Sequence, residues 1–262
     1  GISAAAYLSA AGHEVHVFEK NSTIGGRARQ LKTNNGYVFD MGPSWYWMPG
    51  VFEKFFQDFG CNVSDFYSLK LLDPSFDVVF GEKDTMHVPE NFEQLCALFE
   101  SIEAGSAEKL KLFMQEAEYK YKTGIDNLVY KPGLSLTEFA DMELIRGVFR
   151  LQVFSSFSKH VRSFFQHPKL IALMEFPVLF LGAMPQDTPA LYSLMNYAGL
   201  KLGTWYPEGG FGKVVEGMAA VASKHGAVFH LNADVQHIHV EEGEAKSLLV
   251  NGVAEHFDGI IA

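Results

Sequence analysis

The sequence has few cysteines, a shortage of positive charge and no long apolar run. Its two cysteines, Cys61 and Cys96, lie far apart and outside any C-x-x-C pair, which favours reduced, buried thiols over a disulfide framework. Lys and Arg number 21 against 31 Asp and Glu, and the resulting net charge of −10 argues against a nucleic-acid partner. The longest apolar stretch, residues 176–184, falls short of the roughly 18 residues that span a bilayer.

Several catalytic signatures are also missing. The chain has no G-x-S-x-G elbow, which argues against an α/β-hydrolase. His237 and His239 share one face of a predicted strand, but no third ligand follows at a suitable spacing, so no metal site is expected. Glu241 and Glu242 lie in a polar turn and are read as solvated charge. The sequence therefore assigns no catalytic acid, base or nucleophile.

The first twenty residues predict a unit typical of dinucleotide binding. Residues 2–11 are rich in alanine and predict a helix, and residues 14–18 predict a buried strand with Glu19 at its end. In the motif G-x-G-x-x-G the third glycine opens the helix, and an acid about 20 residues later holds the ribose. Gly1 and Glu19, with Lys20 beside it, fit these two positions, and the first strand would then lie upstream. A βαβ unit without a nucleotide fits the same pattern.

Two glycine-containing loops follow. Gly25 and Gly26 allow backbone amides to approach a pyrophosphate, and Arg27 adds a planar charged fork. Residues 36–40 predict a strand that runs into a turn at Gly42, Pro43 and Ser44. We expect this second loop to reach the isoalloxazine end of a long cofactor.

At this point the chain resembles a known family. Residues 1–44 resemble the two-loop FAD signature of the flavin amine oxidase and phytoene desaturase superfamily. Residues 40–49, with the sequence DMGPSWYWMP, are similar to bacterial phytoene desaturases of the carotenoid pathway. Residues 176–183, 188–192 and 205–211 match that family as well, in order, so the similarity covers nearly the whole chain. The first half of the nucleotide motif and the glycine-rich closing segment are missing, so we expect a fragment that does not fold alone.

The resemblance implies an α/β fold, with a Rossmann-like FAD-binding domain and a discontinuous substrate domain of antiparallel sheet plus helices. Residues 1–66 and 207–262 would form the FAD-binding domain, and residues 67–206 the substrate-binding, membrane-facing domain. The family also implies that the backbone of Val235 contacts adenine.

The activity that the resemblance implies is FAD-dependent desaturation of phytoene, a C40 carotene, toward lycopene or a related carotene. Quinone or oxygen would accept the electrons. Alternatives on the same fold are a polyene saturase, a carotenoid isomerase, a later-step carotenoid desaturase, and a non-redox lipid-binding escort protein.

A basic and aromatic stretch predicts contact with a membrane. Residues 144–174 contain five Lys or Arg and no Asp or Glu. Val153, Phe157, Val161 and Phe164 form a helical stripe, with Lys159 and Arg162 opposite, as in a helix that lies on anionic lipid. The protein is therefore expected in the cytoplasm, peripherally bound to the inner face of the cell membrane. The alternative is a core-packed helical subdomain with a solvated basic face.

The remaining expectations concern local structure. Strands at 66–72, 76–80 and 85–89 would form one small antiparallel sheet, Asn91 and Ser106 would cap two helices, and a helix would span 51–60. Nearly uncharged residues 170–202 would line a long apolar cavity or form plain core. Gly209, Gly210 and Gly212 would open a helix and allow close approach to cofactor or substrate. Further strands are expected at 226–231, 234–240 and 254–262.

Overall fold

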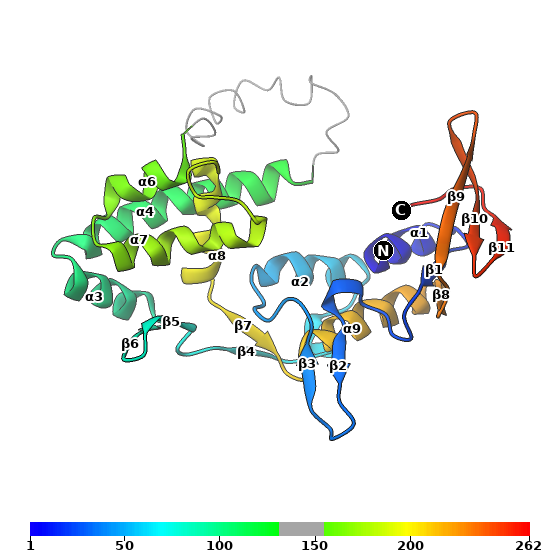
Figure 1. The fold of residues 1–262 in the computed structure, drawn as a ribbon, viewed down its shortest axis with the longest axis horizontal. Coiled ribbons are helices and arrows are strands. Elements are labelled where there is room, and N and C mark those ends of the chain that lie inside the picture. Colours follow the sequence, from blue (N-terminus) through cyan, green and yellow to red (C-terminus); the bar gives the residue numbers. More distant parts are fainter. Residues whose placement is uncertain (131–154) are drawn as a thin grey trace. The chain divides into compact units, whose positions relative to one another are not determined.

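The computed structural model describes residues 1–130 and 155–262, and the chain divides into two compact units. Unit 1 contains Gly1–Lys70 and Tyr206–Ala262, and unit 2 contains Leu71–Trp205. Unit 2 is thus inserted between the two segments of unit 1 (Figure 1). The expected boundaries lay after residues 66 and 206, close to these divisions.

Unit 1 contains a parallel strand pair with helices packed beside it. Strand β1 (His16–Glu19) pairs in parallel with β8 (Val228–Leu231). Helix α1 (Ile2–Ala10) packs against α9 (Phe211–Lys224), and the small buried side chains of α1 permit this close contact. Two strands far apart in sequence therefore lie side by side with their preceding helices (Figure 1). This arrangement agrees with the predicted α/β, Rossmann-like architecture.

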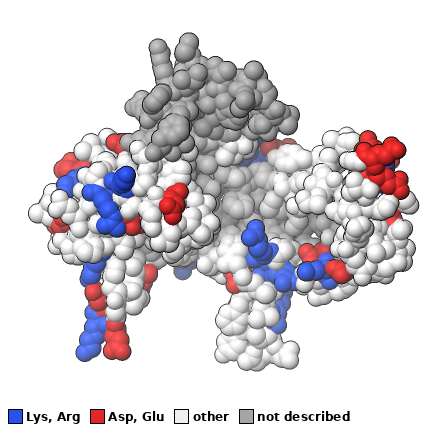
Figure 2. Space-filling view, turned by 45° about the horizontal axis from the view of Figure 1, so that its top comes forward, with Lys and Arg blue, Asp and Glu red and all other residues white. Residues whose placement is uncertain are grey.

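Unit 1 also contains two antiparallel sheets. Strands β2 (Gln30–Lys32) and β3 (Val38–Asp40) form a hairpin, and the 3₁₀ turn η1 (Gly26–Ala28) precedes it. The other sheet has the order β11-β10-β9, from β9 (Val235–Glu241), β10 (Glu244–Val250) and β11 (Val253–His256). Its β9–β10 end carries the acidic side chains that gather at one edge of Figure 2. Strand β10 was not predicted.

An aromatic core packs helix α2 (Pro49–Asp58) against α9. Phe56 is fully buried and stacks on Phe66, and a Cβ built on Gly217 of α9 would lie 2.9 Å from the Phe66 side chain. The buried hydroxyls of Tyr46 and Tyr67 lie 3.0 Å apart. Burial raises the pKa of both tyrosines, so they stay neutral. Helix α2 begins two residues before the predicted start.

The predicted single sheet at residues 66–89 is wrong. Strand β4 (Leu69–Leu71) pairs with β7 (Trp205–Pro207), while β5 (Phe76–Gly81) and β6 (Asp84–Val88) form a separate antiparallel hairpin. The partner of β4 comes from a distant segment, which local periodicity does not reveal.

Unit 2 is mainly helical. Its elements are α3 (Phe92–Ile102), α4 (Ser106–Tyr121), η3 (Lys122–Leu128), α6 (Phe157–Phe164), α7 (Pro168–Glu175), η5 (Phe176–Leu181), η6 (Ala190–Ser193) and α8 (Leu194–Leu200). Asn91 caps α3 as predicted, accepting two backbone N–H groups. Ser106 does not cap α4, because it is the first helical residue and lies buried. The Glu100 carboxylate takes that role and accepts the N–H groups of Gly105 and Ala107 at 2.8 and 3.1 Å.

The aromatic stripe of α6 is part of the core of unit 2. Phe157 and Val161 are fully buried, and the Phe164 ring lies 5.4 Å from Phe113. On the opposite face, Arg162 forms an ion pair of 3.4 Å with Glu175. The prediction of a lipid-facing stripe is therefore wrong for these residues, and the alternative of a core-packed helix holds. Val153 lies outside the described residues. Figure 2 shows blue and red side chains intermixed on the visible face of this unit.

A lysine is buried in unit 2. Lys120 is 1% exposed and donates to the Ala190 carbonyl and the Ser193 hydroxyl at 3.1 and 3.0 Å. Its Nζ also lies 3.4 Å from His160 Nε2. Desolvation lowers the pKa of Lys120 to about 8. Desolvation and the Lys120 charge lower the pKa of His160 to about 4, so His160 is neutral at pH 7.

Candidate cofactor site

The predicted nucleotide residues Gly1 and Glu19 lie at the ends of two neighbouring elements of unit 1. Gly1 is the N-cap of α1, and its carbonyl accepts the Ala5 N–H at 2.9 Å. The first N–H groups of a helix have no partner within the helix, and this end attracts anions. Glu19 ends β1, where Asn21 N–H donates to its Oε1 at 2.9 Å and the Asn21 amide donates to the same oxygen. Asn21 thus orients the carboxylate, and Lys20 beside it is exposed.

The loop at Gly25, Gly26 and Arg27 needs both of its glycines, for different reasons. Gly25 has φ 116°, and a Cβ there would lie 3.2 Å from Val215 of α9. Gly26 has φ 54°, but no atom lies within 4 Å of the corresponding Cβ position. Gly25 therefore serves packing against α9, whereas the open side of Gly26 leaves room for a ligand. The Arg27 side chain is exposed.

The second predicted loop touches the first. Met41 N–H donates to the Arg29 carbonyl at 2.9 Å. A Cβ built on Gly42 would lie only 2.1 Å from the Arg27 carbonyl oxygen, a distance at which no side chain fits. Pro43 and Ser44 follow and are exposed. The structure thus brings together the loops that were predicted for the two ends of one cofactor.

Val235 lies near Glu19. The chain after β8 stays hydrogen-bonded to the end of β1. Ala233 N–H donates to the Glu19 carbonyl and Asn232 N–H donates to the Asn21 carbonyl, both at 3.0 Å. Val235 begins β9 two residues later and is 37% exposed. The predicted ribose acid and the predicted adenine contact therefore lie at the same end of the parallel strand pair.

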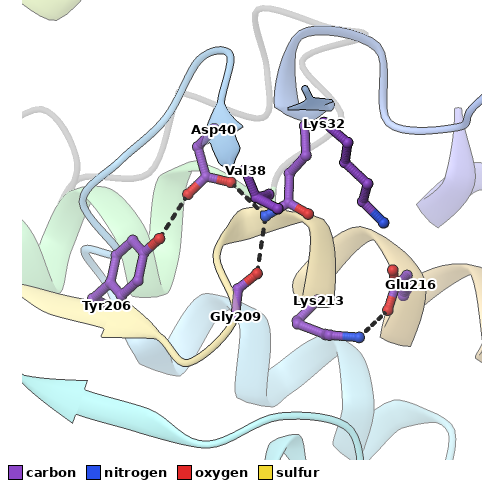
Figure 3. A pocket seen from close by; sticks show the side chains of 8 residues that line it. Lys32, Val38, Asp40, Tyr206, Gly209, Lys213 and Glu216 are labelled. Atoms are coloured by element: carbon purple, nitrogen blue, oxygen red, sulfur yellow. Dashed lines mark hydrogen bonds and ion pairs between the residues drawn. The ribbon is translucent and has the colours of Figure 1, made fainter. Parts of the chain in front are cut away.

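Asp40, Gln30 and Tyr206 form a hydrogen-bonded group that the sequence did not single out. Tyr206 donates to Asp40, and Gln30 donates to both Asp40 and Gly209 (Figure 3). Burial and the Asp40 hydrogen bond raise the pKa of Tyr206. These residues line a cavity of about 380 Å³ together with Lys32, Val38, Lys213 and Glu216.

The glycines at the start of α9 do not face open space. A Cβ on Gly210 would lie 2.3 Å from Gln30 Nε2, and one on Gly212 would lie 2.4 Å from Gln30 Oε1. The expectation that these glycines admit a cofactor or substrate is wrong at these two positions, because the Gln30 side chain fills the space.

Arg29 offers an unused hydrogen-bond donor beside the two loops. Its Nε is buried and finds no hydrogen-bond partner among residues 1–130 and 155–262. A buried donor without a partner costs about 1–3 kcal/mol. An acceptor from a bound group would remove this cost. The open side of Gly26, the helix end at Gly1 and this free donor all fit an anionic dinucleotide.

The residues that the structure describes contain no cluster of three or more His, Cys, Asp or Glu placed to hold a metal ion. In the same residues, no helix has both the length and the apolar composition needed to cross a bilayer. Cys61 and Cys96 are free thiols, and burial raises the pKa of Cys96.

A parallel strand pair, a helix end, an acid at the end of the first strand and two joined glycine loops are features of a dinucleotide-binding fold. The model of the family described as flavin containing amine oxidoreductase matches residues 1–262, and the chain belongs to this family. FAD is thus the cofactor that the site fits.

Several similar proteins are named as desaturases of carotenoids or related polyenes. The chain is 36% identical to a carotenoid 3,4-desaturase from Haloarcula japonica over 100% of its own length and 53% of that protein. It is 31% identical to a 4,4'-diapophytoene desaturase from Staphylococcus haemolyticus, covering 100% of this chain and 52% of that protein. A zeta-carotene-forming phytoene desaturase from Myxococcus xanthus is 30% identical over 96% of the chain and 48% of its own length. The chain thus spans about half the length of these relatives.

Solved structures share the fold at low identity. An oxidoreductase from Methanosarcina mazei aligns with a TM-score of 0.57 and 19% identity, over 98% of this chain and 55% of that one. A Rab GDI from Plasmodium falciparum aligns with a TM-score of 0.57 and 12% identity, over 98% of this chain and 61% of that one.

Proposed function

We propose that the chain is part of an FAD-dependent carotenoid desaturase that converts phytoene toward lycopene or a related carotene. The observation that carries this proposal is the match, along the whole chain, to relatives named as carotenoid, diapophytoene and phytoene desaturases. The geometry supports it, because the two predicted cofactor loops meet at Arg27 and Gly42.

The site residues then take the following roles. The N-terminus of α1 at Gly1, the loop Gly25–Gly26 and the Arg27 side chain hold the diphosphate. Glu19, with Lys20 beside it, accepts hydrogen bonds from the ribose hydroxyls. The backbone of Val235 contacts adenine. Gly42, Pro43 and Ser44 contact the isoalloxazine end. Arg29 supplies one further donor to the cofactor.

Desaturation removes a hydride from one carbon and a proton from its neighbour, and the two carbons become joined by a double bond. FAD held by these residues would supply the hydride acceptor, and a quinone or oxygen would take up the two electrons. Conjugation along the polyene delocalises the positive charge left by the hydride, so the protein mainly binds, orients and excludes water. No residue of this chain is assigned as the base.

The test uses the whole purified protein, loaded with FAD and supplied with phytoene in liposomes and a quinone. Chromatography should show products with more conjugated double bonds, and flavin absorbance should bleach without the quinone. A protein that binds flavin but leaves phytoene and other carotenes unchanged would overturn the proposal. A saturase or an isomerase would be recognised by products of lower or equal oxidation state. A protein without flavin absorbance would favour the lipid-binding escort function.

A second candidate is a later step of the same chemistry. It is favoured by the 36% identity to a carotenoid 3,4-desaturase. Incubation with phytoene and with lycopene in parallel separates the two, because a later-step enzyme would oxidise only the second substrate.

We also propose that the protein binds the inner face of the cell membrane, where a carotene dissolves. The supporting observation is an exposed apolar segment in unit 2, with Leu179 at 73% exposure and Phe180, Leu181 and Met184 also exposed. Changing Leu179 and Phe180 to Ser should weaken binding to anionic liposomes by at least about a hundredfold in a sedimentation assay, since each buried apolar side chain contributes about 1.5–3 kcal/mol and about 1.4 kcal/mol is tenfold. Leu112→Ser, at another exposed leucine of unit 2, is the control.

The basic face of α6 is tested separately, by reversing the charges of Lys159 and Arg162. Reduced liposome binding would assign the contact to α6. Unchanged binding in both experiments would refute membrane association.

A further inference from the structure

The Asp40 carboxylate joins two segments of unit 1 that are far apart in sequence, the β2–β3 hairpin and residues 206–211. Its Oδ1 accepts the Gln30 amide and the Phe211 backbone N–H, both at 2.9 Å, and its Oδ2 accepts the Tyr206 hydroxyl at 3.0 Å. Gln30 and Asp40 are also direct partners in the β2–β3 pairing. Figure 3 shows Asp40 above the start of α9, with Tyr206 reaching it from the side.

The start of α9 is shaped to receive this carboxylate. Phe211 is the first residue of the helix, so its N–H has no partner within the helix, and Asp40 supplies the acceptor. A negative charge at this end is also favourable to the helix dipole. Gly210 has φ 84°, and a Cβ there would lie 2.8 Å from Asp40 Oδ1. The glycine is therefore needed for Asp40 to reach the helix.

Very little backbone separates this contact from the cofactor loops. Gly42, which meets the Arg27 carbonyl, is only two residues beyond Asp40. Between them, Met41 N–H is held by the Arg29 carbonyl at 2.9 Å. The first loop also packs closely on α9, because a Cβ built on Gly25 would lie 3.2 Å from the Val215 side chain. A shift of the Asp40 carboxylate would therefore move Gly42, while the loop at residues 25–27 would keep its position on α9.

We propose that Asp40 is a positioning residue for the flavin. It latches the β2–β3 hairpin onto the N-terminus of α9 and so fixes the distance between the loop Gly25–Arg27 and the loop Gly42–Ser44. The inference rests on the proposed cofactor site. Three protein donors already occupy the Asp40 carboxylate, so this residue acts on the cofactor through the positions of the two loops.

The test compares Asp40→Asn with Asp58→Asn in the whole protein. Asp58 is a matched control, because it also accepts a tyrosine hydroxyl, that of Tyr7 at 2.7 Å, within unit 1. FAD affinity is measured by fluorescence titration of the apoprotein, and the bound flavin is examined by visible circular dichroism at saturating FAD. Asp40→Asn should weaken FAD binding by about tenfold, equivalent to about 1.4 kcal/mol, because the new amide cannot accept all three donors.

The dichroism separates positioning from simple stabilisation. At saturating FAD, Asp40→Asn should keep an altered flavin spectrum, whereas Asp58→Asn should match the wild type. Tyr206→Phe removes only one of the three donors, and it should shift the spectrum in the same direction by a smaller amount, which provides a test if Asp40→Asn does not fold.

Wild-type affinity and spectrum in folded Asp40→Asn would overturn the latch alone. An equal effect of Asp58→Asn, or a wild-type spectrum in Tyr206→Phe when Asp40→Asn is unfolded, would also overturn it. A wild-type protein that binds no flavin would overturn the cofactor site and the latch together.

Discussion

Gly26 offers a direct test of where the diphosphate lies. The residue has φ 54°, and no atom lies within 4 Å of the position that a Cβ would occupy. Gly26→Ala therefore meets no protein atom and costs only the left-handed backbone conformation, about 1–2 kcal/mol. If the cofactor occupies the open side of this loop, the methyl group instead meets the diphosphate. FAD affinity should then fall by at least about tenfold, which corresponds to about 1.4 kcal/mol. The backbone cost is present with and without FAD, so it lowers the stability of the protein and is measured separately.

The control is Gly36→Ala, in the turn of the β2–β3 hairpin. Gly36 has φ 89° and also has no neighbour within 4 Å of the added Cβ, so its backbone cost is of the same kind. Urea unfolding without FAD measures the stability of each variant, and fluorescence titration measures FAD affinity. Both variants should lose similar stability, but only Gly26→Ala should lose affinity. Equal affinities in the two variants would refute the placement of the cofactor beside Gly26.

Three further changes follow from the packing and the charges. Gly42→Ala puts a Cβ 2.1 Å from the Arg27 carbonyl and should destabilise the protein by about 1–3 kcal/mol in urea unfolding; Gly50→Ala, with open space around it, is the control. His160, with a pKa of about 4, stays neutral when folded but is protonated in the unfolded chain below pH 6.5, so stability should fall between pH 6.5 and 4 by about 3 kcal/mol, at about 1.36 kcal/mol per pKa unit. Glu103→Gln should lower the melting temperature, because this half-buried carboxylate accepts hydrogen bonds from two backbone N–H groups at 2.8 Å. Weakening these hydrogen bonds should lower the free energy of unfolding by about 1–3 kcal/mol.

Each of these has an outcome that would contradict it. Equal stability of Gly42→Ala and Gly50→Ala would mean that the two loops are not in contact. For His160, the same loss of stability from pH 6.5 to 4 in His160→Gln would mean that another group is responsible. The pKa of Glu103 is lowered to about 2 because its hydrogen bonds from His167, Lys109 and Gln166 outweigh desolvation. Its contribution is therefore present above pH 4.5 and should disappear as the pH falls toward 2. A Glu103→Gln variant with wild-type stability at pH 7 would contradict this.

Local signals in the sequence predicted the elements that depend on local interactions. Asn91 caps α3 because an Asx side chain reaches the free N–H groups of the next turn, whatever the rest of the chain does. The hairpin β5–β6 follows from alternating residues around a short turn. The loop at Gly25 and Gly26 was recognisable because only glycine adopts its backbone angles without strain.

Contacts between distant segments escaped prediction. The Asp40 carboxylate meets the Phe211 N–H across 171 positions, and no periodicity in either segment records this partner. Gly210 precedes a helix, as the sequence predicts. The Gln30 side chain fills the space beside Gly210, and the sequence contains no local signal of this contact between distant residues. The stripe at Phe157 shows the reverse problem, since a helical apolar face looks the same whether lipid or core covers it.

The position of α9 in the chain has a consequence for synthesis. The cofactor loops lie within the first 44 residues, but the helix that fixes them begins at Phe211, after the whole of unit 2. At a translation rate of about 5–20 residues per second, about 10–35 seconds pass between the synthesis of Asp40 and the synthesis of Phe211. During that time unit 2 can fold first, because its residues are contiguous. The contact between Asp40 and α9, and with it the spacing of the two loops, can therefore form only after unit 2 has been synthesised.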